Sequence, residues 1–338
     1  GTKGVRGANF HCIMSSTSIA PEYSRSEGVA GKIGTTIIAV VAEGSRERVF
    51  LSAEKSHTEV ARSATLPADL AAIHLAIADD PRPMTCLLYG LTHFDELFTP
   101  RQLTALTTFG DLIGEARTRV LADAVDTDLC DDDHQLDDGG KGTVAYAQAV
   151  SVYLAFTLSK SADYWSNLCP WRSDPKNLGI GHVFSRQAIP MIWDFAEGNP
   201  LSNSSGNWLV SLDWVVRVVR NLNQTLSGTA RQLDAQVSGV NRLSACSTDP
   251  PYFDNVGYAD LSDFFYVWLR RSLRDVFPAL LATIAVPKSD ELVAAVYRHG
   301  SKAKSEQFFL DGMTRVMCNA AVQTHPSIPL AIYYAFKQ

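Results

Sequence analysis

Two consecutive prolines, Pro250 and Pro251, place the strongest constraint on how this chain can fold. Proline fixes φ at about −65° and has no amide hydrogen, so the pair cannot lie inside a helix or a central strand. A short apolar run at 242–247 precedes the prolines, and a strongly periodic apolar pattern at 258–277 follows them. The sequence therefore predicts a strand, then a rigid turn, then a helix that stops at Pro278.

The remainder of the C-terminal region has the same alternating character. A helical pattern covers about 303–323, and 329–336 is a strand candidate. Strand, helices and strand in this order are typical of a parallel α/β sheet. We therefore predict an α/β fold with a partial Rossmann-like sheet in residues 236–338.

Upstream of this region the sequence predicts three further segments. They are a small β-containing segment at 1–60, a loop-rich connection at 61–98 and a large helical insertion at 99–235. Within the first segment, two β-like runs flank Gly44 and Ser45, which predicts a hairpin.

The insertion contains three amphipathic patterns. The first begins with Thr99 as the predicted N-cap and Pro100 in the first turn. The other two cover 143–166 and 207–224. These patterns predict three long helices.

Composition narrows the classes of protein that remain possible. The chain has 338 residues, of which 46% are hydrophobic and 20% are charged, which suits two or three domains with packed cores. The net charge of −6 neither indicates nor excludes a nucleic-acid partner.

Six cysteines without a Cys-x-x-Cys pair indicate a reducing, cytoplasmic location. No apolar run is long enough to span a membrane, and because the chain begins at Gly1 we expect a piece of a longer protein.

The turn itself has side chains that suit chemistry on a nucleobase. Asp249 follows the predicted strand, where ligands of open parallel sheets bind. Its carboxylate and the Pro250 carbonyl could accept both hydrogens of an exocyclic amine, drawing its lone pair out of conjugation. Tyr252 offers a flat face on which an extruded base can stack. The alternative interpretation is a structural Pro-Pro turn after a strand.

A family resemblance extends this interpretation. The segment that carries it reads STDPPYFDNVGYADLSDFFYVWLRRSLRDVFPALLAT. It resembles the DNA amino-methyltransferases with an Asp-Pro-Pro-Tyr motif, and more narrowly the adenine-specific DNA methylases that contain a zinc ribbon (domain of unknown function 1156). Further segments of nearly the whole chain are similar to that family: EGVAGKIGTTIIAVVAEG, LFTPRQLTALTTFGDLI, FSRQAIPMIWDFAEGNP and IYYAFKQ.

The resemblance implies a function and a set of roles. Asp249, Pro250, Pro251 and Tyr252 would take the catalytic roles in methyl transfer from S-adenosyl-L-methionine to adenine N6 in DNA. The family context implies restriction–modification or phage defence, with further phage-defence proteins as possible partners. The turn serves adenine N6 and cytosine N4 equally, so the preference for adenine rests on the resemblance.

Two departures from the family pattern limit what this chain can hold. The glycine-rich donor motif has no equivalent here, since the glycines at 138–142 follow acidic residues rather than an apolar strand. The zinc ribbon is represented by His11 and Cys12, with Ser15 where a second cysteine would fall. Four-coordinate zinc needs four ligands, so we predict a degenerate ribbon and no bound metal.

Polar and basic residues elsewhere in the chain are candidates for binding the methyl donor and DNA. Asp194, Glu197 and Asn199 combine carboxylates with an amide and could hold the donor, although a helix end before Pro200 explains them equally well. The residues predicted to contact DNA are Asn255, Tyr258, Arg270, Arg271 and Lys288. The alternatives are helix capping for the first two and a solvated basic helix face for the others.

Taken as a whole, the sequence predicts a fragment of an adenine-specific DNA methyltransferase. A hypothesis from another class stays open, in which the chain is a non-catalytic nucleic-acid-binding or scaffold module that kept the fold and lost the activity.

Overall fold

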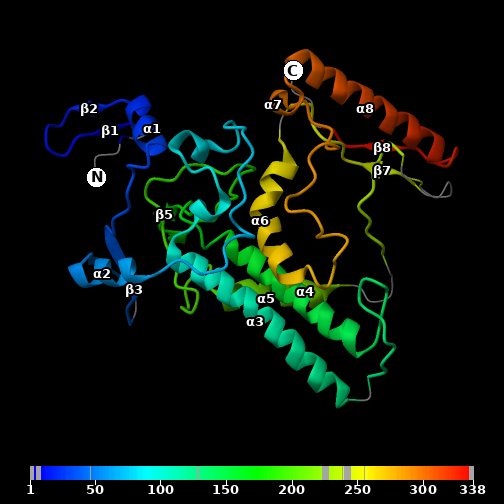
Figure 1. Cartoon of the computed structure of the whole chain (residues 1–338), viewed down its shortest axis with the longest axis horizontal. Coiled ribbons are helices and arrows are strands. Elements are labelled where there is room, and N and C mark those ends of the chain that lie inside the picture. Colours follow the sequence, from blue (N-terminus) through cyan, green and yellow to red (C-terminus); the bar gives the residue numbers. More distant parts are fainter. Residues whose placement is uncertain are drawn as a thin grey trace. The chain divides into compact units, whose positions relative to one another are not determined.

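The computed structural model describes residues 4, 9–45, 47–127, 129–222, 228–237, 239, 245–254 and 256–334. The chain divides into two compact units. The first comprises Gly1–Val218 and Phe264–Ile284, and the second comprises Val219–Asp263 and Ala285–Gln338. The fold is mixed α/β with helices predominating, as Figure 1 shows. Among the described residues each sheet has two strands, so the predicted Rossmann-like sheet is not confirmed.

The N-terminal part of the first unit alternates short hairpins with short helices. Its elements are β1 (Phe10–His11), β2 (Ser18–Ile19), α1 (Pro21–Val29), β3 (Ala39–Glu43), β4 (Arg48–Ser52) and α2 (Lys55–Ser63). β3 and β4 pair antiparallel, with Glu43 opposite Arg48. The hairpin predicted around Gly44 is therefore confirmed.

The segment predicted as a loop-rich connection contains two short 3₁₀ helices, η1 (Thr85–Tyr89) and η2 (Phe94–Leu97). Gly90 ends η1 with φ of +83°, a left-handed conformation that glycine adopts without strain.

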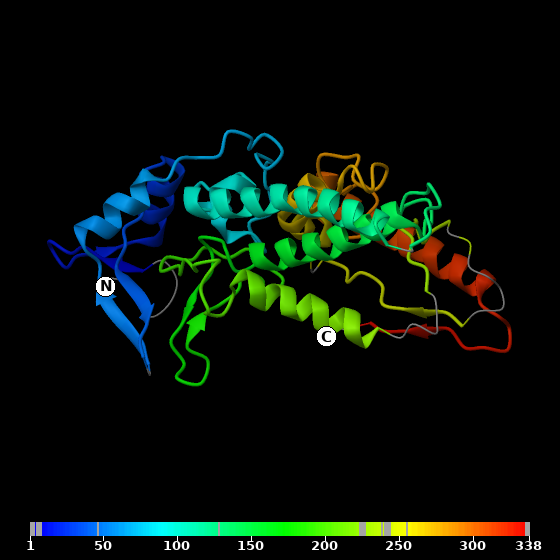
Figure 2. The ribbon, with the colours of Figure 1, turned by 90° about the horizontal axis from the view of Figure 1, so that it is seen from below.

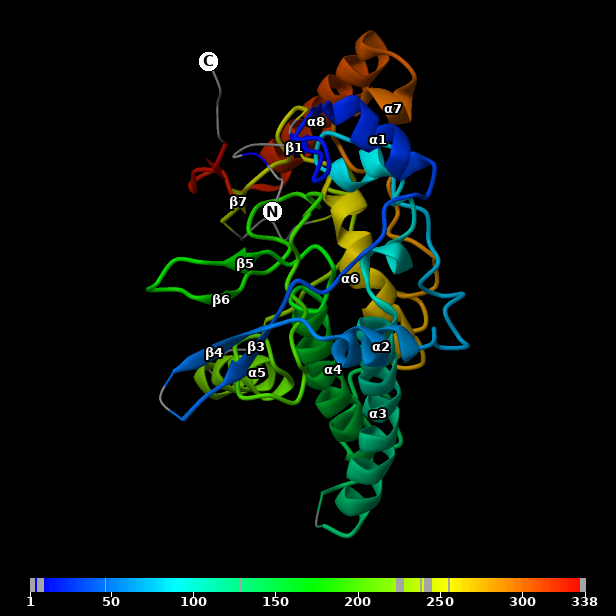
Figure 3. The same cartoon turned by 90° about the vertical axis from the view of Figure 1, so that its left-hand side faces the viewer.

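Two long helices form the scaffold of the first unit. α3 (Pro100–Val125) begins as predicted, because the Thr99 side chain accepts a hydrogen bond from the backbone of Gln102 and the Gln102 side-chain oxygen accepts one from the Thr99 amide. α3 and α4 (Thr143–Ala162) run side by side in Figures 1 and 3. The third predicted helix is α5 (Trp208–Asn221). The ring of Trp208, its first residue, stacks on that of Phe109 in α3, with centroids 4.4 Å apart.

The hairpin of β5 (Trp171–Arg172) and β6 (Gly179–Ile180) lies beside the β3–β4 hairpin. β5 and β6 pair antiparallel and, like β3 and β4, project from the helices in Figures 2 and 3. Arg48 donates a hydrogen bond of 2.5 Å to the Leu178 carbonyl, and Phe50 meets Trp171 edge to face.

The aromatic core of the first unit includes the C-terminal half of α6 (Tyr258–Leu273). Phe264 and Trp268 are fully buried, and both rings contact Phe98. The predicted helix at 258–277 therefore exists and ends at Leu273, several residues before Pro278. Because this half of α6 packs in the first unit, the compact units do not follow the boundary predicted at 236.

The second unit contains the predicted C-terminal strands in shortened form. Its elements are β7 (Ser247–Thr248), the start of α6, α7 (Val296–His299), α8 (Lys302–Gln323) and β8 (Ala331–Ile332). Residues 242–244 and 335–336 of the predicted strands lie outside the described residues. The core is an apolar cluster of Leu292, Ala294 and Phe309, against which Phe253 and Phe308 pack.

Candidate active-site turn

The Asp249–Tyr252 turn follows a parallel strand pair. Ser247 is paired with Ala331, and Thr248 with Ile332. The Thr248 carbonyl accepts a hydrogen bond of 2.8 Å from the amide of Tyr333. The prediction that Asp249 comes directly after a strand is confirmed for this two-residue strand. Asp249 therefore stands where the carboxyl ends of two parallel strands meet, the edge at which ligands bind in open α/β sheets.

The residues of the turn differ in their exposure to solvent. Pro250 is buried, Asp249 is exposed and Tyr252 is half-buried. The Tyr252 hydroxyl donates a long hydrogen bond of 3.4 Å to Oδ1 of Asp249. Because a bond of this length is weak, an incoming donor could replace it at the carboxylate. The phenol and the carboxylate thus share one exposed corner.

Tyr334 completes this corner, and sequence reasoning did not identify it. Its ring meets that of Tyr252 edge to face, with centroids 5.3 Å apart and planes at 84°. The Tyr334 hydroxyl accepts a hydrogen bond of 3.4 Å from the Phe253 amide. The available signal was the position of Tyr334 near the end of the strand candidate at 329–336, since the ends of neighbouring parallel strands meet at one edge.

The end of the turn is fixed in the apolar core of the second unit. The Phe253 carbonyl accepts a hydrogen bond of 2.7 Å from the Ala294 amide. The Phe253 ring meets Phe309 edge to face at 5.2 Å. The residue after the motif is therefore held by both its backbone and its side chain.

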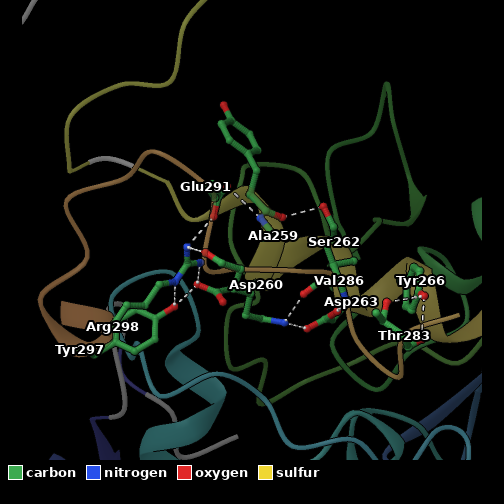
Figure 4. Close-up of polar contacts among 12 residues, drawn as sticks. Ala259, Asp260, Ser262, Asp263, Tyr266, Thr283, Val286, Glu291, Tyr297 and Arg298 are labelled. Atoms are coloured by element: carbon green, nitrogen blue, oxygen red, sulfur yellow. Dashed lines mark hydrogen bonds and ion pairs between the residues drawn. The ribbon is translucent and has the colours of Figure 1, made fainter. Parts of the chain in front are cut away.

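A network of charged side chains holds the first turns of α6, immediately after the motif (Figure 4). Glu291 Oε1 accepts a hydrogen bond of 3.0 Å from the Ala259 amide, satisfying one of the donors that a helix N-terminus leaves unpaired. Glu291 Oε2 accepts one of 2.8 Å from Arg298 Nη1, and Arg298 Nη2 reaches Asp260 Oδ2 at 2.7 Å. Tyr297 joins the network, donating its hydroxyl to Asp260 and accepting from Arg298 Nε at 2.8 Å.

The ion pair at the centre of the network is buried, which makes its pairing important. The side chains of Arg298 and Asp260 are 9% and 2% exposed. Burial lowers the pKa of Arg298, but its hydrogen bonds to Glu291, Tyr297 and Asp260 outweigh burial and raise the pKa overall. Burial and the bond to Asp260 raise the pKa of Tyr297, which keeps the hydroxyl protonated as the donor. Removing Arg298 would leave the carboxylates of Asp260 and Glu291 without their cation.

A second ion pair lies one turn further along α6. Lys288 Nζ is 2.5 Å from Asp263 Oδ2, and the Val286 amide donates to Asp263 Oδ1 at 2.7 Å. Burial raises the pKa of Asp263, while the hydrogen bond from Lys288 acts in the opposite direction. Residues 286–291 are thereby fastened to the start of α6. Asp260 and Asp263 were also missed by sequence reasoning, although acidic residues at i and i+3 on an apolar helix face were a usable signal.

The residues predicted to contact DNA differ in their surroundings. Tyr258 is 44% exposed, and Asn255 lies outside the described residues. Arg271 pairs with Asp69 and Asp111, each at 2.9 Å, and Lys288 pairs with Asp263 as described above. Arg270 is half-buried, and its Nε has no hydrogen-bond partner among the described residues. Arg271 and Lys288 therefore have internal partners that account for them without phosphate.

The residues predicted to hold the methyl donor lie in the first unit, whereas the Asp249 turn lies in the second. Both oxygens of Glu197 accept hydrogen bonds from Arg101, at 2.6 and 2.7 Å, and Oε2 also accepts one from Thr99. Asn199 Oδ1 accepts a hydrogen bond from the Leu201 amide at 2.9 Å, and Asp194 is exposed. Glu197 thus fastens its loop to the start of α3, whereas Asn199 stabilises a turn within that loop, and both side chains have internal partners.

The predicted ribbon remnant forms the β1–β2 hairpin. Ser16 occupies the turn with φ of +58°. Hydrogen bonds from Ser15 lower the pKa of the Cys12 thiol. In the part of the chain that the structure describes, no group of three His, Cys, Asp or Glu side chains is placed to hold a metal ion.

Comparisons with known proteins identify no relative: no family model, no curated protein and no solved structure matches this chain. Among the described helices, none combines the length and hydrophobicity that crossing a membrane requires.

Proposed function

We propose that this chain carries the catalytic turn of a DNA amino-methyltransferase that modifies adenine N6. The observation that carries the proposal is the position of Asp249, directly after a strand in a parallel pair and at the start of a turn whose next residue, Phe253, is held in the core of the second unit. We take β7 and β8 to be two strands of a partial Rossmann-like sheet, in a cytoplasmic protein whose partner is DNA.

The chemistry assigned to the turn is acceptance of amine hydrogens. The exposed Asp249 carboxylate accepts one hydrogen of the exocyclic amine, and the Pro250 carbonyl, whose direction the two prolines restrict, accepts the other. Both bonds favour a pyramidal nitrogen whose lone pair is available for attack. The Tyr252 ring receives the base once it has left the duplex.

The methyl group in this proposal comes from S-adenosyl-L-methionine, which supplies a methyl bound to a sulfonium. Because Glu197 and Asn199 are engaged by Arg101, Thr99 and Leu201, no step is assigned to them. The role of the described residues is limited to positioning the amine and its base.

A non-catalytic DNA-binding or scaffold module is the second candidate. The exposure of Asp249 favours it, because a carboxylate in water is a weaker acceptor for an amine than one in an enclosed site. The internal ion pairs of Arg271 and Lys288 also reduce the positive charge available to DNA phosphates.

The test compares methyl transfer to DNA by the full-length protein and two matched variants. Asp249→Asn removes the charge at the turn, and Asp290→Asn removes an exposed charge elsewhere in the second unit. We expect Asp249→Asn to lower the rate about 100-fold or more, in the range found when a positioned polar group is removed, and Asp290→Asn to leave it unchanged. Equal rates for all three proteins would remove Asp249 from the mechanism, and absence of transfer by the unaltered protein would favour the scaffold.

A further inference from the structure

An aromatic cleft opens in the first unit, apart from every residue assigned above to methyl transfer. Its volume is about 210 Å³, and it lies between the β1–β2 hairpin, α1 and the loop that carries Trp193. The residues that form its walls include Phe10, Ile19, Tyr23, Glu27, Ile33 and Trp193.

The rings of this aromatic cleft are fixed relative to one another. Trp193 meets Phe10 edge to face, with centroids 4.8 Å apart and planes at 75°. Trp193 also meets the buried ring of Tyr89, with centroids 5.0 Å apart and planes at 85°. Phe10 is paired across the hairpin with Ile19, so two strands present their side chains to the same cleft.

Close backbone packing joins α1 to the segment that supports Trp193. A Cβ on Gly28 would lie 2.6 Å from the Tyr89 carbonyl oxygen, and one on Gly90 would lie 2.6 Å from the Gly28 carbonyl oxygen. Glycine at both positions allows this approach. Tyr23 and Glu27 on α1 are therefore held in a set position relative to Tyr89 and, through it, to Trp193.

The arrangement of these groups favours a compact cation over a flat ring. Rings at nearly right angles form a corner, and the negative π faces of such a corner attract a cation from more than one direction, whereas a nucleobase needs one open parallel face. Of the residues that line the cleft, Glu27 is the one with a charge. It pairs with Lys32 at 3.0 Å, but the Lys32 side chain is 62% exposed, so another cation can exchange for it at little cost.

We propose that the aromatic cleft binds a quaternary ammonium group. Phe10, Tyr23 and Trp193 surround the methyl groups, which carry the delocalised positive charge. Ile19 and Ile33 contact the attached alkyl chain, and Glu27 balances the charge at the rim. This inference does not depend on the proposed methyl transfer, because every residue it uses lies in the first unit.

The primary experiment needs no variant. Calorimetric titration of the full chain with choline is compared with titration by 3,3-dimethyl-1-butanol, the neutral carbon isostere of the same shape. We expect choline to bind about tenfold more tightly, the ratio that a cation–π contribution of moderate size gives. Equal binding of the two would show an ordinary apolar site and overturn the proposal, as would tighter binding of adenosine than of choline.

Two variants and a control place the binding in the cleft. Trp193→Ala should weaken choline binding about tenfold, and Glu27→Gln, which changes a side chain at the rim, about threefold. Trp214→Ala removes a tryptophan that is 54% exposed on α5 and should change nothing. Should Trp193→Ala fail to fold, retention of full affinity by Glu27→Gln together with equal binding of the isostere contradicts the proposal.

A third titration distinguishes the two sources of such a group. A short peptide with trimethyl-lysine is compared with the same peptide carrying unmodified lysine. Tighter binding of the methylated peptide than of choline identifies a protein ligand, and the reverse order identifies a free quaternary amine. Failure of both to bind contradicts the proposal.

Discussion

Residues 258–263 and 264–273 form one continuous helix, α6, but different kinds of side chain hold the two halves. In the second unit, the first half is fastened by ion pairs and hydrogen bonds from Arg298, Glu291 and Lys288. In the first unit, the second half is held by apolar contacts, with Phe264 and Trp268 fully buried. Apolar burial supplies free energy without strict geometry, whereas a buried ion pair requires its partners at defined positions. The polar half is also the one that adjoins the Asp249 turn.

The largest effect on stability is expected from the second half of α6, residues 264–273, which is held by aromatic contacts. Trp268→Ala removes a fully buried ring that contacts Phe98, leaving a large cavity. The free energy of unfolding of the first unit should fall by about 4 kcal/mol. Trp268→Phe is the matched control and should cost less, because it keeps an aromatic ring and removes an indole N–H that has no hydrogen-bond partner among the described residues. Urea denaturation measures both, and similar values for the two variants would contradict the importance of ring volume here.

In the polar half, removal of one charge should have a somewhat smaller effect. Arg298→Met leaves the buried Asp260 and the partly buried Glu291 without their cation, which should destabilise the second unit by about 3 kcal/mol. Amide hydrogen exchange at residues 258–263 should accelerate, since Glu291 would lose the partner that orients it.

The triple variant Arg298→Met, Asp260→Asn, Glu291→Gln is the control for that experiment. It removes the uncompensated charges as well, so it should recover part of the lost stability. No recovery would mean that the packing of the arginine side chain, rather than its charge, holds the helix.

The smallest expected effect concerns pH and lies just beyond the end of α6. A hydrogen bond from Arg117 lowers the pKa of Asp275 below its ordinary value of 3.8. The ionised carboxylate therefore favours the folded state above pH 3.8, and this contribution disappears as the pH falls through the lowered pKa. Asp275→Asn should lose a small amount of stability at neutral pH and none in acid, measured as the urea midpoint against pH. The side chain is 64% exposed, so a large loss at neutral pH would contradict this interpretation.

Local sequence signals predicted most of the elements. The hairpin around Gly44, the capped start at Thr99 and the long helices depend on periodicity and turn chemistry, which neighbouring residues determine. The pairing of β7 with β8 joins residues far apart in the chain, and the predicted order of strands and helices was sufficient to place them in parallel. The larger sheet in which we expected that pair is not confirmed among the described residues.

The functional details depended on contacts that local patterns do not contain. Arg271 and Glu197 were predicted as ligand contacts, but each meets oppositely charged residues distant in sequence: Asp69 and Asp111 for Arg271, and Arg101 for Glu197. The sequence gives the charge of a side chain, but it does not show which residue that side chain pairs with in the fold. For the same reason Tyr334 and the Asp260 network escaped prediction, because their roles arise from packing around the turn.

The most direct measurement is identification of the methylated nucleoside. DNA incubated with the full-length protein and S-adenosyl-L-methionine carrying a labelled methyl group is digested to nucleosides and analysed by mass spectrometry. We predict label on N6 of deoxyadenosine with the unaltered protein and with Asp290→Asn, and loss of that label with Asp249→Asn. Label on N4 of deoxycytidine would keep the mechanism and change the substrate, whereas label that persists undiminished in Asp249→Asn would contradict the account.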